Sequence, residues 1–164
     1  MDHELLSRDH SEIDRLFAKA RAAIGNDEDV LDLVDLLWAR LAVHIRAEHL
    51  HVFPALTELA EQASDSETVK TIANLRADHD FFMKEFASIV KKLRLDPLSD
   101  AIKDPLDQIA RRLESHNIVE ENQIYPLIDE RLAGDVRDEL IQRAQGELDK
   151  VPSRFSEADW RRTD

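Results

Sequence analysis

Residues 44–54 read HIRAEHLHVFP, and residues 116–126 read HNIVEENQIYP. Each segment contains a histidine, a glutamate four residues later, and then a β-branched residue, an aromatic residue and a proline. Residues four apart on an α-helix lie on the same face, so each segment presents an imidazole and a carboxylate in one direction. Two pairs of this kind could hold two metal ions.

A second repeat lies upstream of each motif. Asp9-His10 precedes the first motif and Asp78-His79 precedes the second, and apolar residues follow both pairs at helical spacing. Each half of the chain is therefore predicted to be a helical hairpin with a histidine on its first helix and His-x-x-x-Glu on its second. Two hairpins make a four-helix bundle.

The composition also favours helices. Only three glycines and five prolines occur, and apolar residues recur at spacings of three and four. We expect an all-α fold in which residues 1–133 form an up-down-up-down four-helix bundle. Residues 134–164 are expected to add a C-terminal helical segment, which runs to about Lys150, and a tail that either frays and trails from the bundle or is anchored on it by Phe155 and Trp160.

Local signals predict several helix boundaries. Pro54 lacks an N–H group and is expected to kink or end the second helix. Ser64 or Ser66 is expected to cap the third helix. Leu98 is expected to begin the apolar stripe of the fourth, with Pro105 in its first turn.

The predicted hairpins bring a set of polar residues to one level. In an up-and-down bundle, two residues lie at the same height when they are equally far along the chain from the loop between them. Measured from the three predicted loops, the candidate ligands all fall near the middle of the bundle. They are His10, His44, Glu48, His79, His116 and Glu120.

These six residues lie within the apolar stripes of the predicted helices. An unpaired carboxylate there would cost several kcal/mol or would protonate, so the group needs a partner with positive charge. Mixed imidazole and carboxylate ligation suits iron, manganese or zinc, and two carboxylates on opposing helices are placed to bridge a pair of ions. The alternative is a plain structural bundle with hydrogen-bonded core histidines.

The other three histidines are expected to lie outside the ligand set. His3 would lie near the end of the bundle, and His49 would be solvated. His51 is a competitor, because Glu48-x-x-His51 has the spacing used in ferritin-like sites with two metal ions. Its counterpart in the second repeat is Gln123.

The paired motifs resemble those of the hemerythrin-like (HHE cation-binding) family over roughly residues 3–130. The resemblance implies a non-haem centre of two iron ions with the six residues as ligands, bridged by Glu48 and Glu120. Oxygen-carrying hemerythrins have His-x-x-x-His on the third helix, where Met83 follows His79 here, and His-x-x-x-x-Asp on the fourth. This difference implies an additional open position on one iron, which favours small-molecule redox chemistry or metal sensing over oxygen carriage.

The charge and composition exclude several classes of partner. With 22 basic and 35 acidic side chains the net charge is -13, which argues against binding to nucleic acid or an anionic membrane. The chain contains no cysteine, so a disulfide framework or a thiolate metal site is excluded. No signal peptide or membrane span is predicted, and the cytoplasm is the expected location.

Three functions are compatible with these observations. The first is a protein that binds or reduces a small diatomic or peroxide ligand (O2, peroxide or nitric oxide) at an open iron position. The second is a non-enzymatic iron-binding or iron-sensing module whose folding depends on metal. The third follows from resemblance to the di-iron proteins that repair iron–sulfur clusters, which usually carry an additional cysteine-bearing N-terminal domain.

Overall fold

The computed structural model describes residues 4–27 and 29–150, and within these residues it contains helices and no strands. The predicted all-α class is confirmed. The described residues form seven α-helices and two short π-helical turns, which are labelled η. They are α1 (Glu4–Ala23), α2 (Val30–Ala47), η1 (Glu48–Val52), α3 (Phe53–Gln62), α4 (Ser66–Leu95), α5 (Lys103–Val119), η2 (Glu120–Ile124), α6 (Pro126–Arg131) and α7 (Gly134–Leu148).

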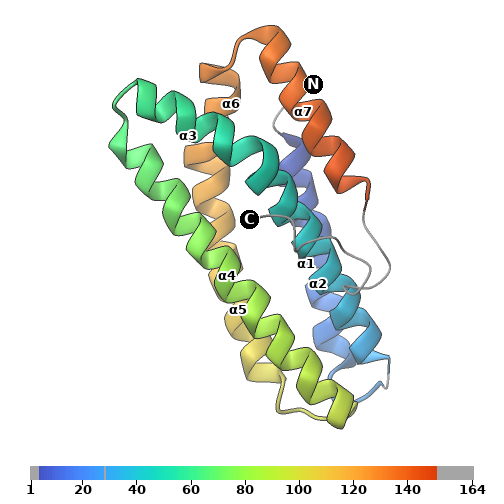
Figure 1. Ribbon diagram of the computed structural model, residues 1–164. Helices are drawn as coiled ribbons and strands as arrows, with labels where there is room; N and C mark the ends of the chain where they lie inside the picture. Colours follow the sequence, from blue (N-terminus) through green and yellow to red (C-terminus); the bar gives the residue numbers. More distant parts are fainter. Residues whose placement is uncertain (1–3, 28, 151–164) are drawn as a thin grey trace.

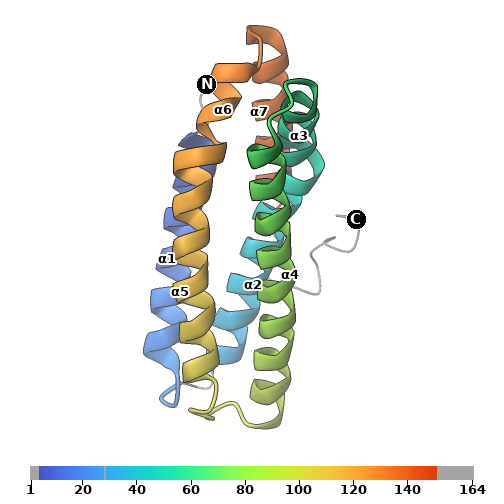
Figure 2. The same cartoon turned by 90° about the vertical axis from the view of Figure 1, so that its left-hand side faces the viewer.

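Four long helices pack side by side in a bundle (Figures 1 and 2). Both α1 and α4 contact α2 and α5. We refer to α1 and α2 with η1 as the first hairpin, and to α4 and α5 with η2 as the second hairpin. The predicted positions of His3, Phe155 and Trp160 cannot be compared, because these residues lie outside the described part of the chain.

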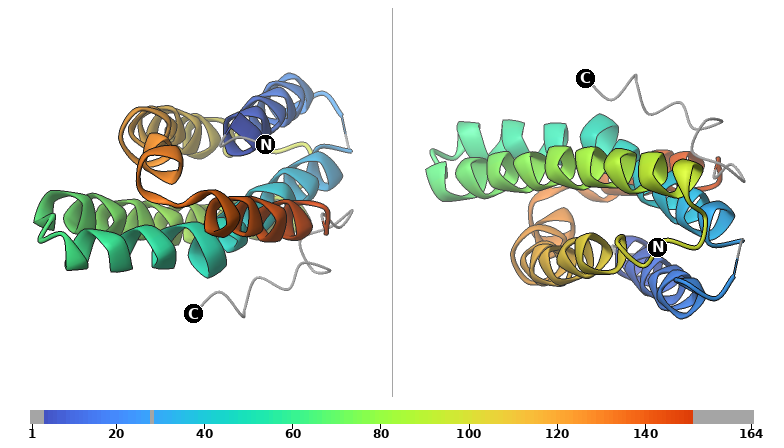
Figure 3. Two further views of the ribbon diagram at one scale, coloured as in Figure 1. Left: turned by 90° about the horizontal axis from the view of Figure 1, so that it is seen from above. Right: turned by 90° about the horizontal axis from the view of Figure 1, so that it is seen from below.

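The helix α7 packs against α2 and η1, and it lies beside α2 when the bundle is viewed from above (Figure 3). Arg46 donates a hydrogen bond of 2.8 Å to Glu147 across this contact. A C-terminal helix was predicted here, whereas the division of the chain at residue 133 stays a prediction. None of the described helices is long and apolar enough to cross a membrane.

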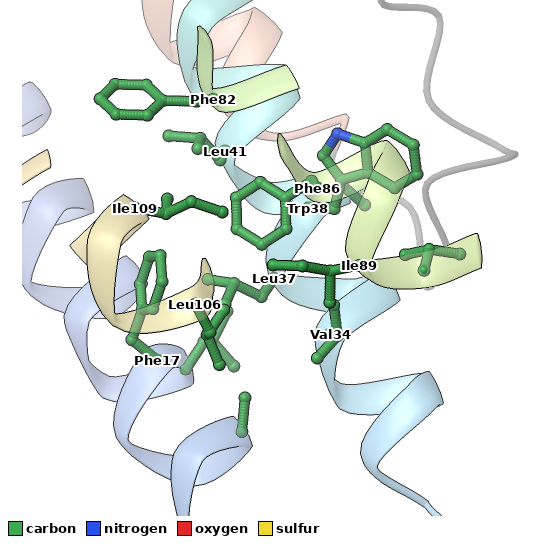
Figure 4. Close-up of a cluster of buried hydrophobic side chains, with 14 of the residues drawn as sticks. Phe17, Val34, Leu37, Trp38, Leu41, Phe82, Phe86, Ile89, Leu106 and Ile109 are labelled. Carbon is green, nitrogen blue, oxygen red and sulfur yellow. The ribbon is translucent and has the colours of Figure 1, made fainter. Parts of the chain in front are cut away.

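The apolar stripes form two separate cores. The larger core fills one end of the bundle, where Phe17, Leu37, Phe86 and Leu106 meet from four helices (Figure 4). The other core includes Phe53 and lies where α3, α6 and α7 join the bundle. On each long helix the polar candidate residues lie between residues of the two cores, so apolar packing closes both ends of the site.

Each His-x-x-x-Glu motif ends in a π-helical turn. The N–H of Phe53 bonds to the carbonyl of Glu48, and the N–H of Tyr125 bonds to the carbonyl of Glu120 at 2.8 Å, both five residues back. A proline lies in the first two positions of the α-helix that follows each turn. The predicted interruption at Pro54 therefore occurs as a widened turn before the proline, and the chain changes direction there (Figure 1).

Two predicted helix boundaries were wrong. Asp65 caps α4, because its Oδ1 accepts a hydrogen bond of 3.1 Å from the Thr68 N–H. Ser64, one of the predicted caps, lies two residues after the end of α3 and has a φ of 56°, and Ser66 is the first residue of α4. Leu98 lies before α5 and is 47% exposed, so the apolar stripe begins later than predicted.

Candidate metal centre

The structure brings all six predicted residues together in the middle of the bundle. All six residues are buried, and none is more than 4% exposed. Their ligand atoms form two groups, each with atoms within 4.8 Å of one another. One group contains His10, His44 and Glu120, and the other contains His79, His116, Glu48 and Glu120.

The four imidazoles meet in pairs. His10 Nε2 lies 3.1 Å from His44 Nε2, and His79 Nε2 lies 3.1 Å from His116 Nε2. Two ligands at right angles on one ion, with bonds of about 2.1 Å, would lie about 3.0 Å apart. The spacing in each pair therefore suits two nitrogens on one metal ion, and each pair comes from one hairpin.

The two carboxylates link the hairpins. Glu120 Oε1 lies 3.3 Å from His10 Nε2 and 3.2 Å from His116 Nε2. Glu48 Oε1 likewise lies 3.4 Å from one imidazole nitrogen of each hairpin. Each carboxylate therefore reaches both pairs of imidazoles, as a bridge between two ions requires.

The outer nitrogen of His44 is held by a carboxylate that sequence reasoning missed. His44 Nδ1 donates to Asp9 Oδ2 at 2.8 Å, because a carboxylate can only accept. Arg40 donates to the other oxygen of Asp9 at 2.9 Å. With its proton on Nδ1, the neutral imidazole directs the lone pair of Nε2 into the centre.

The second hairpin repeats this arrangement. His116 Nδ1 donates to Asp78 Oδ2 at 3.0 Å, and Arg112 donates to Asp78 Oδ1 at 3.0 Å. The signal was present in the sequence, because an aspartate precedes His10 and His79 and an arginine precedes each motif by four residues. Each aspartate orients the histidine of the neighbouring helix.

His49 and its repeat counterpart Glu121 support the other two imidazoles. Glu121 Oε1 lies 2.9 Å from His10 Nδ1, and His49 Nε2 lies 2.8 Å from His79 Nδ1. The prediction that His49 is a solvated bystander was therefore wrong. The two repeats support equivalent imidazoles with different chemistry, a carboxylate in one case and an imidazole in the other.

Tyr125 adds a hydroxyl group at one side of the centre. This fully buried phenol donates a hydrogen bond of 2.9 Å to Glu48 Oε2. Its oxygen also lies 3.1 Å from His10 Nε2 and 3.3 Å from His44 Nε2. A polar group therefore lies beside the imidazole pair of the first hairpin.

Phe53 takes the corresponding position on the other side. Its ring stacks on the His79 imidazole, with centroids 5.7 Å apart and planes inclined by 7°. Sequence reasoning identified an aromatic residue after each motif without assigning it to the site. The exchange of Tyr125 for Phe53 makes the two sides of the centre chemically different.

The buried carboxylates lack enough hydrogen-bond donors. Glu48 Oε1 and both oxygens of Glu120 have no hydrogen-bond partner among the described residues. Burial raises the pKa of Glu48 well above its ordinary value, and the charge of Glu120 acts in the same direction. The pKa of Glu120 lies well below its ordinary value, because its interactions with Glu48, His116 and His10 outweigh the effect of burial.

These features fit a cation. Carboxylate oxygens without hydrogen-bond partners among the described residues and inward-facing imidazole nitrogens converge on one buried space, and buried polar groups need a partner. Comparison with known families agrees, because a model described as the hemerythrin HHE cation-binding domain matches residues 1–128. The chain belongs to this family. Searches of curated proteins and of solved structures found no match.

Two residues of this hemerythrin-like chain lie apart from the centre. His51, the predicted competitor, is not in either group, and its Nε2 lies 3.8 Å from Glu147 Oε1. Met83 packs against the larger apolar core. No additional imidazole therefore enters the centre from these two positions.

Proposed function

We propose that this hemerythrin-like protein holds two non-haem iron ions and binds or reduces O2, peroxide or nitric oxide. The ligands would be the six clustered residues, with Glu48 and Glu120 as bridges, in an up-down-up-down four-helix bundle. The observation that carries the proposal is the division of the cluster into two donor sets that share Glu120.

The donor types favour iron. One set has two imidazoles and one carboxylate, which is typical of non-haem iron(II) sites that keep open positions. The other has two imidazoles and two carboxylates. Manganese and zinc accept the same ligand types and are the alternatives.

An open position suits small-molecule chemistry. Iron of octahedral geometry has more positions than the three or four ligands in each set. When bound, the iron pair would supply Lewis acidity and redox equivalents. Tyr125 offers a hydroxyl beside His10 and His44, whereas Phe53 offers only its ring beside His79. We infer that a small polar ligand prefers the first hairpin's side.

The protein's own residues would keep the site dry and ordered. Apolar packing above and below excludes water, and the hydrogen bonds from His44 to Asp9 and from His116 to Asp78 fix the imidazole tautomers. Partners on the outer nitrogens of ligands maintain geometry when the oxidation state changes. This arrangement supports redox chemistry at a fixed site.

An iron-sensing role is the second candidate. It is favoured by the bridging of the two hairpins, since Glu120 contacts imidazoles of both. Metal occupancy would then control how firmly the hairpins dock. The repair of iron–sulfur clusters stays an expectation from family resemblance, without a feature of the described residues that favours it.

Metal analysis tests the proposal. Protein reconstituted with ferrous iron under anaerobic conditions and then desalted should retain about two iron ions per chain, because the ligands form two sets. Glu120→Ala should lose both ions, since this carboxylate belongs to both sets, whereas His51→Ala should retain them. Wild-type protein that retains no metal would contradict the proposal.

Optical spectroscopy separates the two candidate functions. The reduced iron-loaded protein is exposed to O2, peroxide or nitric oxide, and its visible spectrum is followed. A spectral change with consumption of the added molecule supports the first function. Iron that is bound and released without any such reaction supports the sensing role.

A further inference from the structure

A buried centre needs a route by which metal reaches it. The six clustered residues are closed off from solvent, yet a groove of about 590 Å³ between α1 and α5 reaches one of them, His10. Glu121, whose side chain is 38% exposed, also lines the groove and bonds to the His10 imidazole. The groove thus connects solvent with a side chain of the centre through one carboxylate.

Oxygen donors follow this groove inward. Asp14 and Glu114 are exposed carboxylates on its two walls, and Glu121 lies next to His10. Asn117 also lines the groove, is only 8% exposed, and its side-chain oxygen has no hydrogen-bond partner among the described residues. A buried amide oxygen without a donor is costly unless something polar, such as a cation, approaches it.

The charges in the groove favour a cation. Desolvation raises the pKa of Asp14, and the carboxylates of Glu114 and Glu121 raise it further, against the opposite effects of His10 and Arg21. The groove also contains two arginines, and the charge of one is offset by the Asp107 carboxylate. Arg21 pairs with its carboxylate at 3.0 Å, and Arg111 donates to its backbone carbonyl at 3.4 Å. The three mutually repelling carboxylates would be relieved by a bound cation.

The other side of the bundle provides an internal comparison. The two halves of the chain can be aligned by matching His10 with His79 and the first motif with the second. In this alignment, the four groove residues with oxygen-bearing side chains match residues whose side chains contain no oxygen. These counterparts are Met83, Ala42, Ile45 and His49. Ala42 and Ile45 are buried in the larger core, and Met83 packs against it. The polar groove therefore exists on one side of a repeated structure.

We propose that the groove between α1 and α5 is the uptake route for divalent iron, with the oxygens of Asp14, Glu114, Asn117 and Glu121 as transient ligands. Exposed oxygen ligands bind and release divalent ions readily, whereas the mixed imidazole and carboxylate sets beyond them retain iron. A neutral diatomic molecule would gain nothing from charged walls. The proposal rests on the proposed function, because it requires iron at the centre.

Uptake kinetics test the route. Apo-protein is mixed with ferrous iron in a stopped-flow instrument under anaerobic conditions, and final iron content is measured separately. Asp14→Asn/Glu114→Gln should slow uptake about tenfold at low salt, because attraction of the ion is lost. Asn117→Leu should slow it several-fold at any salt concentration. Neither change should reduce the final iron content.

A matched control corrects for total charge. Asp135→Asn/Glu130→Gln makes the same change in net charge on exposed residues of α6 and α7, and its uptake rate should equal that of wild type. The route is overturned if the groove variants take up iron as fast as this control, or if they lose iron content without slower uptake. Wild-type protein that holds no iron would overturn the proposed function and the route together.

Discussion

The outer nitrogen of each clustered imidazole has its own partner. Three of the four imidazoles face carboxylates, and the exception is His79, which faces His49. A carboxylate partner makes an imidazole a stronger ligand than a neutral partner does. Burial also lowers the pKa of His79 well below its ordinary value. His79 is therefore the one clustered imidazole whose hydrogen-bond partner, His49, can be uncharged.

Removal of this support should weaken metal binding. His49→Ala is expected to lower metal affinity about tenfold, because the loss of such partners commonly costs a factor of this size or more. Competition with a chelator of known affinity measures the effect. The control is His51→Ala, two residues away and outside the cluster, which should leave the affinity unchanged. Equal affinities of wild type and His49→Ala would show that the contact has no role in metal binding.

The residues of the centre were only partly predictable. His44 and Glu48 were identified because residues four apart lie on the same face of any α-helix. His49 was assigned to solvent because it aligns with the charged Glu121 of the other repeat, but Glu121 itself bonds to His10, as His49 does to His79. Tyr125 was missed because nothing in one sequence says what a buried phenol will contact.

At the scale of the elements, the two widened turns share a sequence feature. Each precedes a proline that cannot donate to the preceding turn. The prolines made an interruption predictable, but the choice between a helix end, a kink and a π turn depends on packing. In both repeats the turn begins at the glutamate of the motif, so the irregular backbone coincides with the candidate bridges.

The cap of α4 leads to a prediction about acid stability. Hydrogen bonds from Thr68 and Arg131 lower the pKa of Asp65 from 3.8 to about 2. Because the folded-state pKa is depressed, this stabilisation is present above about pH 4 and is lost as the pH falls through about 2. The melting temperature of wild type should therefore exceed that of Asp65→Asn at neutral pH, and the difference should narrow between pH 4 and pH 2.

Thermal melts at a series of pH values check this expectation. The control is Glu67→Gln, which removes a carboxylate from the same turn of α4. Its melting temperature should follow that of wild type through the acid range. A difference between wild type and Asp65→Asn that stays constant down to pH 2 would mean that the carboxylate charge does not contribute to the cap.

At the scale of the whole molecule, the polar centre interrupts an otherwise continuous apolar interior. Without a cation, three of the four carboxylate oxygens of Glu48 and Glu120 are buried with no hydrogen-bond partner among the described residues. Such groups must protonate, admit water or separate, and each option costs free energy. The two apolar cores remain on either side, so we expect the apo-protein to stay helical but to be less stable.

Metal should therefore raise the melting temperature. Binding to the folded chain alone stabilises it by about 2.7 kcal/mol when the free ion is at about 100 times its Kd. Circular dichroism melts of apo and iron-loaded protein measure the shift, and Glu120→Ala serves as the control that should not respond to iron. Identical melting temperatures for the apo and loaded wild type would place the metal elsewhere or exclude it.

The predictable part of the whole fold was its symmetry. Equal distances from the loops placed His10 and His44 at one height, because both helices have the same rise per residue. The position of α7 was not predictable, since no repeat or spacing indicates which helices its buried apolar residues and the ion pair between Arg46 and Glu147 will join. The groove between α1 and α5 could not be predicted from the sequence either, because it depends on how closely neighbouring helices pack.

The sharing of Glu120 has a consequence for the order of events during synthesis. His10, His44 and Glu48 leave the ribosome before any residue of the second hairpin. Glu120, which lies in both groups of the centre, emerges after the other five residues. Translation that stops before this codon releases a chain without the glutamate that both groups share.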